Sequence, residues 1–159
     1  MIVNFPNTPV IKGQKSIFLA GPVLRTVPYA DGWRNHAITI LQQLKFNGIV
    51  YVPEFPLGTS AEYYDVETQT FWEWEAMDSA DVIVFWVPRD ENGMEGYTTN
   101  IEFGRYLTKS PEKIILGFPK EALRMDYMTL LYANESKREP TYTLQETLES
   151  ALMLLGKDG

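Results

Sequence analysis

The chain has 159 residues, which favours one domain of ordinary size over residues 1–159. Its formal net charge of −7, with no Lys/Arg cluster, argues against binding a nucleic acid polymer, although a single nucleoside needs only a local pocket. The absence of Cys excludes disulfides and a thiol nucleophile, and no apolar run reaches the roughly 18 residues of a membrane span. With no signal-peptide pattern, we expect no membrane association and a cytoplasmic location.

The first third of the chain predicts two strands separated by a helix. Residues 1–14 predict an extended lead-in without regular structure, and residues 15–20 (KSIFLA) predict a strand. Gly21 follows directly, where it lets the backbone turn sharply and a ligand approach closely. Asp31 is the expected N-cap of the helix, and residues 49–52 predict the second strand.

After a long polar and aromatic loop, residues 66–79 predict a helix. Its buried face is expected to carry Phe71, Trp74 and Met77, with Val66 or Thr70. Glu73 then lies at or beside the buried stripe. A Glu in that position is commonly a solvated carboxylate on the helix rim, and a functional carboxylate is the alternative.

The most informative pattern is a strand, a loop and a helix within residues 81–106. The strand at 81–87 is almost entirely apolar, as in a strand covered on both faces. Thr98 or Thr99 is expected to open the helix. Glu102 then lies in the first turn, where it either completes a capping box with Thr99 or acts as a functional carboxylate at the sheet edge where ligands bind.

The remaining residues continue the alternation of strands and helices. They predict a strand at 113–118, an apolar-rich helix or irregular segment at 120–133, a polar connection at 134–140, and a last helix with a capping box that starts at Thr143. Such alternation indicates a doubly wound α/β sandwich with a mainly parallel sheet.

Several enzyme classes lack their motifs in this sequence. The single His, His36, is expected on a helix surface, and there is no GxSxG elbow, so a hydrolytic triad is not expected. There is no HExxH, CxxC or phosphate-binding GxxxxGK[ST] loop, so the sequence implies neither a metal nor another cofactor. Carboxylate chemistry remains, with Glu102 and Glu73 as candidates.

Five motifs, taken in chain order, resemble the nucleoside 2-deoxyribosyltransferase family and its nucleotide N-glycosidase relatives. They are IFLAGP at 17–22, WR at 33–34, VPE at 52–54, the spacing from Glu73 to Ala80-Asp81, and GYTTNIEFGRY at 96–106. The resemblance covers about residues 15–118 and implies a flavodoxin-like three-layer sandwich. It also implies a pentosyltransferase that cleaves the N-glycosidic bond of 2′-deoxynucleosides and passes the sugar to another base.

The same resemblance implies roles for the two carboxylates. Glu102 corresponds to the nucleophile that traps C1′ as a covalent ester, and Glu73 to the acid/base or a group that orients the substrate. Many members carry Asp where this chain has Glu73. The family's sugar-binding acid has two candidates here, Asp90 and Glu95.

The remaining expected contacts involve the sugar, the base and a 5′ substituent. The substrate-binding residues implied by the motifs are Phe18, Gly21, Trp33, Arg34, Glu54, Gly96, Thr98, Thr99, Asn100 and Met125. Phe18 and Trp33 would stack on the base or fill the core. Arg34 would meet a 5′-phosphate or form a surface ion pair.

Family members assemble as oligomers, so the resemblance implies a homo-oligomer, from dimer to hexamer. Residues 125–128 of one subunit would form a lid over the neighbouring site. The partners would be a small-molecule nucleoside and a free base. Two alternatives are a deoxynucleoside 5′-monophosphate N-glycosidase that uses water, and a non-catalytic nucleotide-binding module on the same fold.

Overall fold

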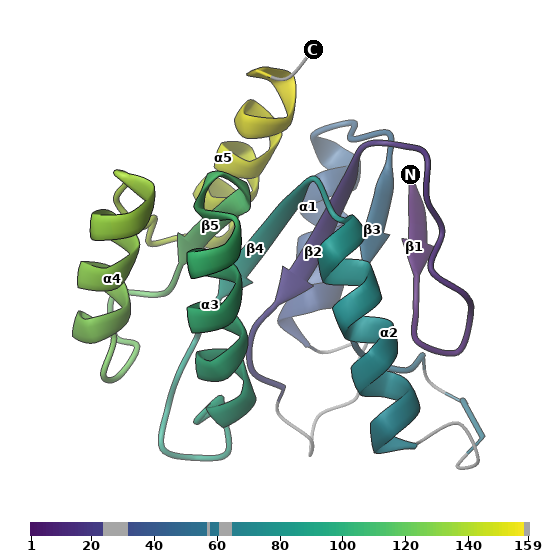
Figure 1. The fold of residues 1–159 in the computed structure, drawn as a ribbon, viewed down its shortest axis with the longest axis horizontal. Coiled ribbons are helices and arrows are strands. Elements are labelled where there is room, and N and C mark those ends of the chain that lie inside the picture. Colours follow the sequence, from purple (N-terminus) through teal and green to yellow (C-terminus); the bar gives the residue numbers. More distant parts are fainter. Residues whose placement is uncertain (24–31, 57, 61–64, 158–159) are drawn as a thin grey trace.

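The computed structural model describes residues 1–23, 32–56, 58–60 and 65–157, which form a parallel sheet between two layers of helices (Figure 1). The strands are β1 (Ile2–Asn4), β2 (Ser16–Ala20), β3 (Ile49–Tyr51), β4 (Val82–Trp86) and β5 (Ile114–Gly117). Within the described residues the sheet order is β1-β3-β2-β4-β5, and every neighbouring pair is parallel. The expected flavodoxin-like α/β architecture is confirmed.

Helices cover both faces of the sheet, and this explains why the central strands are buried throughout. The helices are α1 (Trp33–Gln43), α2 (Val66–Ser79), α3 (Tyr97–Lys109), the short 3₁₀ helix η3 (Pro111–Lys113), α4 (Asp126–Ser136) and α5 (Leu144–Lys157). Alternate residues of β2 serve the two cores: Phe18 packs on the side of α2, α3 and α4, whereas Ile17 packs on the side of α1 and α5.

The chain changes direction across the sheet between β2 and β4. From β2 it passes through α1 to β3 on one side, and it then returns through α2 to β4 on the other. The carboxyl ends of β2 and β4 therefore form a topological switch point, where ligands bind in this class of fold. Gly21 lies there with φ of +148°, and a Cβ on it would come within 2.1 Å of the Trp86 carbonyl oxygen. Only glycine fits this position without moving β4.

Three sequence expectations are wrong in detail. The lead-in contains β1, which pairs with β3 at the sheet edge. On α2 the buried residues are Trp72, Ala76 and Met77. Val66 is exposed, and so are Phe71 and Trp74, which pack edge-to-face on each other. α3 begins at Tyr97 rather than at Thr98 or Thr99, because Gly96 adopts the left-handed conformation and serves as its N-cap.

The predicted ends of the other helices agree with the structure only in part. The expected cap of α1, Asp31, lies outside the described residues, and Gly32 occupies the N-cap position. α4 continues to Ser136, beyond the expected limit. The capping box before α5 is confirmed, since Glu146 N donates to Thr143 Oγ1 at 3.2 Å and Thr143 Oγ1 donates to the Glu146 carboxylate at 2.9 Å. In the part of the chain that is described, every helix is too short or too polar to serve as a membrane span.

Replacing Gly21 by Ala should destabilise the fold by at least about 2 kcal/mol, because the new Cβ meets the β4 backbone at a strained φ. Urea unfolding followed by circular dichroism measures this. Gly104→Ala is the matched control: it lies within α3 with nothing within 4 Å of its Cβ position, so it should be neutral or stabilising by up to about 1 kcal/mol. Equal stabilities for the two variants would contradict the close-approach argument.

Candidate active site

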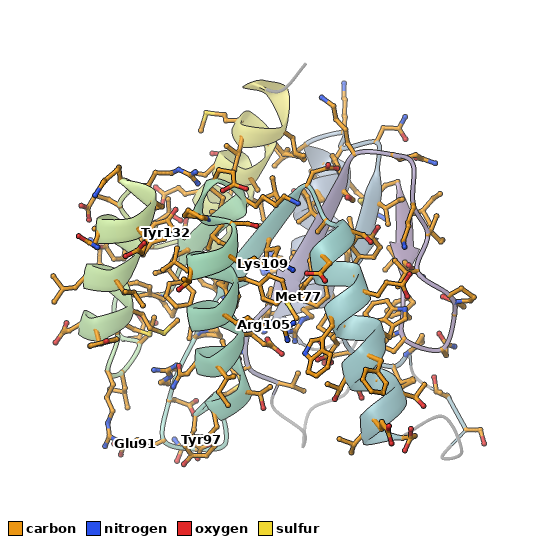
Figure 2. All side chains as sticks on the ribbon, viewed as in Figure 1. Met77, Glu91, Tyr97, Arg105, Lys109 and Tyr132 are labelled. Carbon is orange, nitrogen blue, oxygen red and sulfur yellow. The ribbon has the colours of Figure 1, made fainter. Side chains whose placement is uncertain are left out.

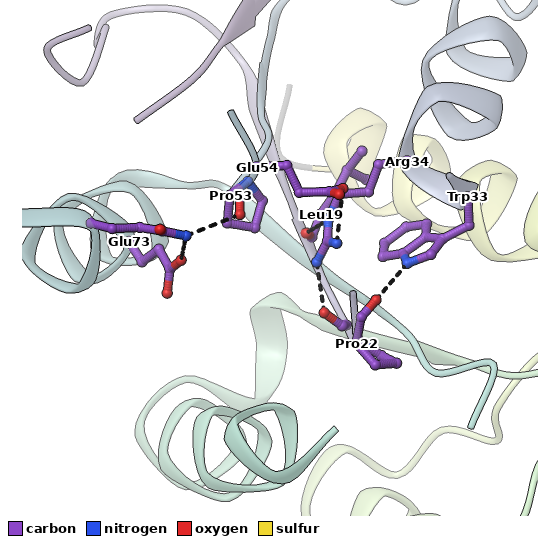
Figure 3. Close-up of polar contacts among 9 residues, drawn as sticks. Leu19, Pro22, Trp33, Arg34, Pro53, Glu54 and Glu73 are labelled. Carbon is purple, nitrogen blue, oxygen red and sulfur yellow. Dashed lines mark hydrogen bonds and ion pairs between the residues drawn. The ribbon is translucent and has the colours of Figure 1, made fainter. Parts of the chain in front are cut away.

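Arg34 is a buried cation at the carboxyl ends of β2 and β3, with an exposed fraction of 1%. Its Nε donates to Leu19 O at 2.9 Å, its Nη2 to Gly21 O at 2.7 Å, and its Nη1 to Glu54 Oε2 at 3.1 Å (Figure 3). All three guanidinium nitrogens therefore donate hydrogen bonds to groups of the protein itself. The expected ion pair of Arg34 is therefore present, with Glu54, but it is buried rather than on the helix surface. A contact of Arg34 with a 5′-phosphate stays a prediction.

The two aromatic candidates for base stacking both have contacts within the protein. Phe18 is 1% exposed, and its ring lies 6.5 Å from those of Tyr51 and Trp72, so it is a core residue. Trp33 donates from Nε1 to Pro22 O at 3.0 Å, and the guanidinium of Arg34 lies 4.4 Å from its ring centroid. The Trp33 hydrogen bond thus stabilises the turn that follows β2.

Glu73 is half-buried on α2 rather than solvated on its rim. Its Oε1 accepts from Gln69 Nε2 at 2.9 Å, and the same amide donates to Pro53 O at 3.3 Å (Figure 3). Burial raises the pKa of Glu73, while the Gln69 hydrogen bond and the charge of Arg34 oppose that rise. Gln69 was missed in the sequence, although its spacing of four residues on a helix is the signal for such a pair.

Glu102 is half-buried in the second turn of α3, and it does not cap the helix. If Thr99 were the N-cap, α3 would start at Asn100, but it starts three residues earlier, at Tyr97. No side chain caps its N-terminus, and Thr99 is only 3% exposed. Within the described residues, no group donates a hydrogen bond to the Glu102 carboxylate. Burial first, and then the negative charge of Glu73, raises the pKa of Glu102 to about 7, against the opposing charge of Arg34.

The geometry of α2 and α3 explains how the two carboxylates come to interact. Both helices begin at the carboxyl edge of the sheet and run back along the same face (Figure 1). Glu73 is the eighth residue of α2 and Glu102 the sixth of α3, so each lies about two turns from the start of its helix. In Figure 2, Met77 of α2 and Arg105 of α3 lie on the facing sides of these helices, and Arg105 stacks 4.8 Å from the Trp74 ring centroid.

Other expected residues shape the site without facing the carboxylate pair. Glu54 forms the ion pair with Arg34, and Gly96 turns the chain into α3. Thr98 is exposed, and Asn100 is exposed and accepts a hydrogen bond from Arg89.

The structure also shows the surroundings of the remaining candidates. Asp90 accepts from the backbone N of Asn92, Glu95 is half-buried, and His36 is exposed on α1 as expected. Met125 and Met128 are buried in the core of their own chain, at 5% and 6% exposure, whereas Tyr127 between them is exposed. A lid at residues 125–128 over a neighbouring subunit's site stays a prediction. Among the residues that the structure describes, no group of three His, Cys, Asp or Glu side chains is placed to hold a metal.

A family model described as nucleoside 2-deoxyribosyltransferase like matches residues 14–121, more than half of the chain. The chain belongs to this family. The matched span carries Arg34, Glu73 and Glu102, and it indicates an enzyme of the nucleoside deoxyribosyltransferase type. A search of curated proteins found no matching sequence.

Replacing Glu102 by Gln should stabilise the protein at pH 8 and leave its stability unchanged near pH 4. The pKa of Glu102 is about 7 in the folded protein, above the value of about 4.3 for an unfolded Glu, so the folded state binds more protons between these values and loses stability as pH rises. The full cost, up to about 4 kcal/mol, is present above pH 7 and absent from the Gln variant.

Urea unfolding at pH 4, 6 and 8 tests this expectation. Glu139→Gln, on an exposed side chain, is the control and should show no such trend. A change in the free energy of unfolding of Glu102→Gln that is the same at all three pH values would contradict the raised pKa of Glu102.

Proposed function

We propose that this protein is a nucleoside 2-deoxyribosyltransferase that moves 2-deoxyribose from one purine or pyrimidine base to another. Glu102 is the nucleophile, and Glu73 is the acid/base or orients the substrate. Membership of the nucleoside 2-deoxyribosyltransferase-like family supports the reaction class. The observation that carries the assignment is the Glu102 carboxylate itself, which is half-buried, has no hydrogen-bond donor among the described residues, and lies within electrostatic reach of a second carboxylate.

In the first step an oxygen of Glu102 attacks C1′ and the C1′–N bond breaks, with its electron pair passing to the base. A proton from Glu73 or from solvent neutralises the departing base. The sugar remains as an ester on Glu102, as in retaining glycosidases. In the second step a nitrogen of the incoming base attacks C1′, its proton passes to Glu73, and the Glu102 carboxylate is released.

The electrostatics of the pair suit this sequence of steps. An ionised Glu102 that lacks hydrogen bonds loses little solvation when it attacks a carbon that becomes positively charged. Glu73 has a raised pKa and is held in position by Gln69, which suits a group that gives and takes a proton.

The direct test is base exchange from deoxyinosine to adenine, followed by chromatography. Glu102→Ala should abolish exchange, and Glu73→Gln should reduce it by about 10²-fold or more. Glu75→Gln, on the exposed side of α2 in an ion pair with Lys12, is the matched control and should retain activity. Full exchange by Glu102→Ala would refute the nucleophile assignment.

Mass spectrometry of the protein quenched during turnover separates the roles of the two carboxylates. A deoxyribosyl adduct on the peptide that contains Glu102 supports the assignment, whereas an adduct on the peptide that contains Glu73 reverses the two roles. Base release from deoxynucleoside 5′-monophosphates without an acceptor base identifies an N-glycosidase instead. Binding without any bond cleavage identifies a non-catalytic module.

We also propose that the protein forms a homo-oligomer through the outer face of α2, α3 and α4. Large apolar side chains on this layer are exposed by 55–80%: Val66, Phe71, Tyr97, Ile101, Tyr127 and Leu130. On the opposite layer, within the described residues, Met153 is the one large apolar side chain exposed to that degree. A concentration of apolar surface on one layer marks an interface in water-exposed proteins.

Sedimentation of the wild type should show a dimer or larger assembly. Ile101→Lys combined with Leu130→Lys should shift it to the monomer, because the charges cannot be buried without partners. Met153→Lys on the opposite layer is the control and should leave the assembly unchanged. A monomeric wild type at micromolar concentration would contradict the proposal.

A further inference from the structure

Gln69 joins Glu73 to the segment that follows β3. It is the fourth residue of α2, and its side-chain Nε2 donates to Glu73 Oε1 at 2.9 Å and to Pro53 O at 3.3 Å (Figure 3). The residue after Pro53 is Glu54, which forms the buried ion pair with Arg34. The amide therefore ties the Glu73 carboxylate to the same stretch of backbone that Arg34 holds.

The Pro53 carbonyl fixes which way round the Gln69 amide lies. A backbone carbonyl only accepts hydrogen bonds, so the NH₂ group of the amide, and not its oxygen, must face it. The same nitrogen donates its second hydrogen to Glu73 Oε1. If the amide were turned over, its oxygen would face the Pro53 oxygen. Gln69 therefore offers Glu73 a donor whether the carboxyl group is ionised or protonated.

A neutral Glu73 consequently carries its proton on one particular oxygen. A proton on Oε1 would point at a nitrogen that only donates, whereas Oε2 has no hydrogen-bond donor among the described residues. We propose that Gln69 is a positioning residue for deoxyribosyl transfer, because its amide directs the moving proton to Oε2 of Glu73. This inference rests on the proposed function, in which Glu73 is the acid/base.

Both proton movements of the reaction then take place at Oε2. As the C1′–N bond breaks and its electron pair passes to the base, the proton leaves Oε2 for the base, and Glu73 becomes ionised with Oε1 still bonded to Gln69. In the second step the incoming base bonds to C1′, its proton passes to Oε2, and the Glu102 carboxylate is released. A Glu side chain without such a bond could present either oxygen, so Gln69 removes the wrong orientation before the reaction starts.

Charged groups from other elements also act on Glu73. Burial raises its pKa, whereas the Gln69 hydrogen bond and then the charge of Arg34 on α1 lower it. Glu54 neutralises part of the Arg34 charge, and Glu102 on α3 is coupled to Glu73. Without the Gln69 donor the ionised form of Glu73 loses a hydrogen bond. The pKa of Glu73 should then rise, and the pair should keep its last proton to a higher pH.

Gln69→Met removes the donor but keeps a side chain of similar length, and a titration without substrate measures the consequence. The Glu73 carboxyl-carbon NMR signal should titrate at a higher pH in Gln69→Met than in the wild type. Gln69→Glu replaces the amide by an acceptor that repels an ionised Glu73, so it should move the titration further in the same direction.

Gln145→Met is the matched control. Gln145 Nε2 donates to Glu149 Oε1 at 2.9 Å, over the same spacing of four residues, but the pair is exposed on α5. This variant loses an equivalent hydrogen bond away from the carboxylate pair. It should leave the titration of Glu73 and the rate of base exchange unchanged.

Base exchange from deoxyinosine to adenine gives the kinetic test. Gln69→Met should lower kcat by about tenfold or more with a smaller change in KM, because the proton donor is no longer held in one orientation. The alkaline limb of the pH profile of kcat should move to higher pH together with the titration of Glu73. A purely structural role would lower the stability of the variant and leave this limb in place.

The two kinds of measurement separate failure of this inference from failure of the proposed function. An unchanged titration of Glu73 in Gln69→Met, or an unchanged alkaline limb in an active variant, overturns the inference. A wild type that performs no base exchange contradicts the proposed function instead. The titration contains no nucleoside, so it still decides whether Gln69 controls the proton of Glu73.

Discussion

The burial of the Arg34 guanidinium is the constraint on which the rest of the candidate site depends. Its hydrogen bonds to Leu19 O and Gly21 O fix the turn after β2, and its ion pair with Glu54 fixes the segment after β3. The turn has little freedom because Gly21 packs against the carbonyl of Trp86. Removing one partner of such a buried pair costs about 3–5 kcal/mol, so this arrangement is built to be rigid.

The same cation sets the electrostatics of the carboxylates. Arg34 is paired with Glu54 at 3.1 Å, so part of its charge is already neutralised before it acts on Glu73 and Glu102. The pKa values of Glu73 and Glu102 are both raised despite the positive charge of Arg34. Because the two carboxylates interact, their protons come off as a coupled pair, and the site can hold a proton near neutral pH.

Long apolar patterns predicted the strands well, because a strand buried on both faces reads as a continuous run. β1 was not predicted, because a strand of three residues is too short to show a recognisable hydrophobic pattern. Phe71 and Trp74 were assigned to the wrong face of α2 because aromatic residues occur on all sides of that helix, and tertiary packing chose Trp72. The sequence singled out Glu102 and Glu73 but did not predict that Arg34 is buried, because a buried arginine and a surface one look alike until the backbone carbonyls that it meets are known.

Whether Glu102 caps its helix or remains free is decided by the backbone at Gly96. With φ of +66°, Gly96 starts α3 at Tyr97, which moves Glu102 from the capping position into the second turn and toward α2. The same early start turns Asn100 toward Arg89. One left-handed glycine therefore places Glu102 on the α2 side of α3 and Asn100 on the side of Arg89. Unbalanced charge at the ligand-binding edge of a parallel sheet costs stability, and function is the usual reason that proteins keep it.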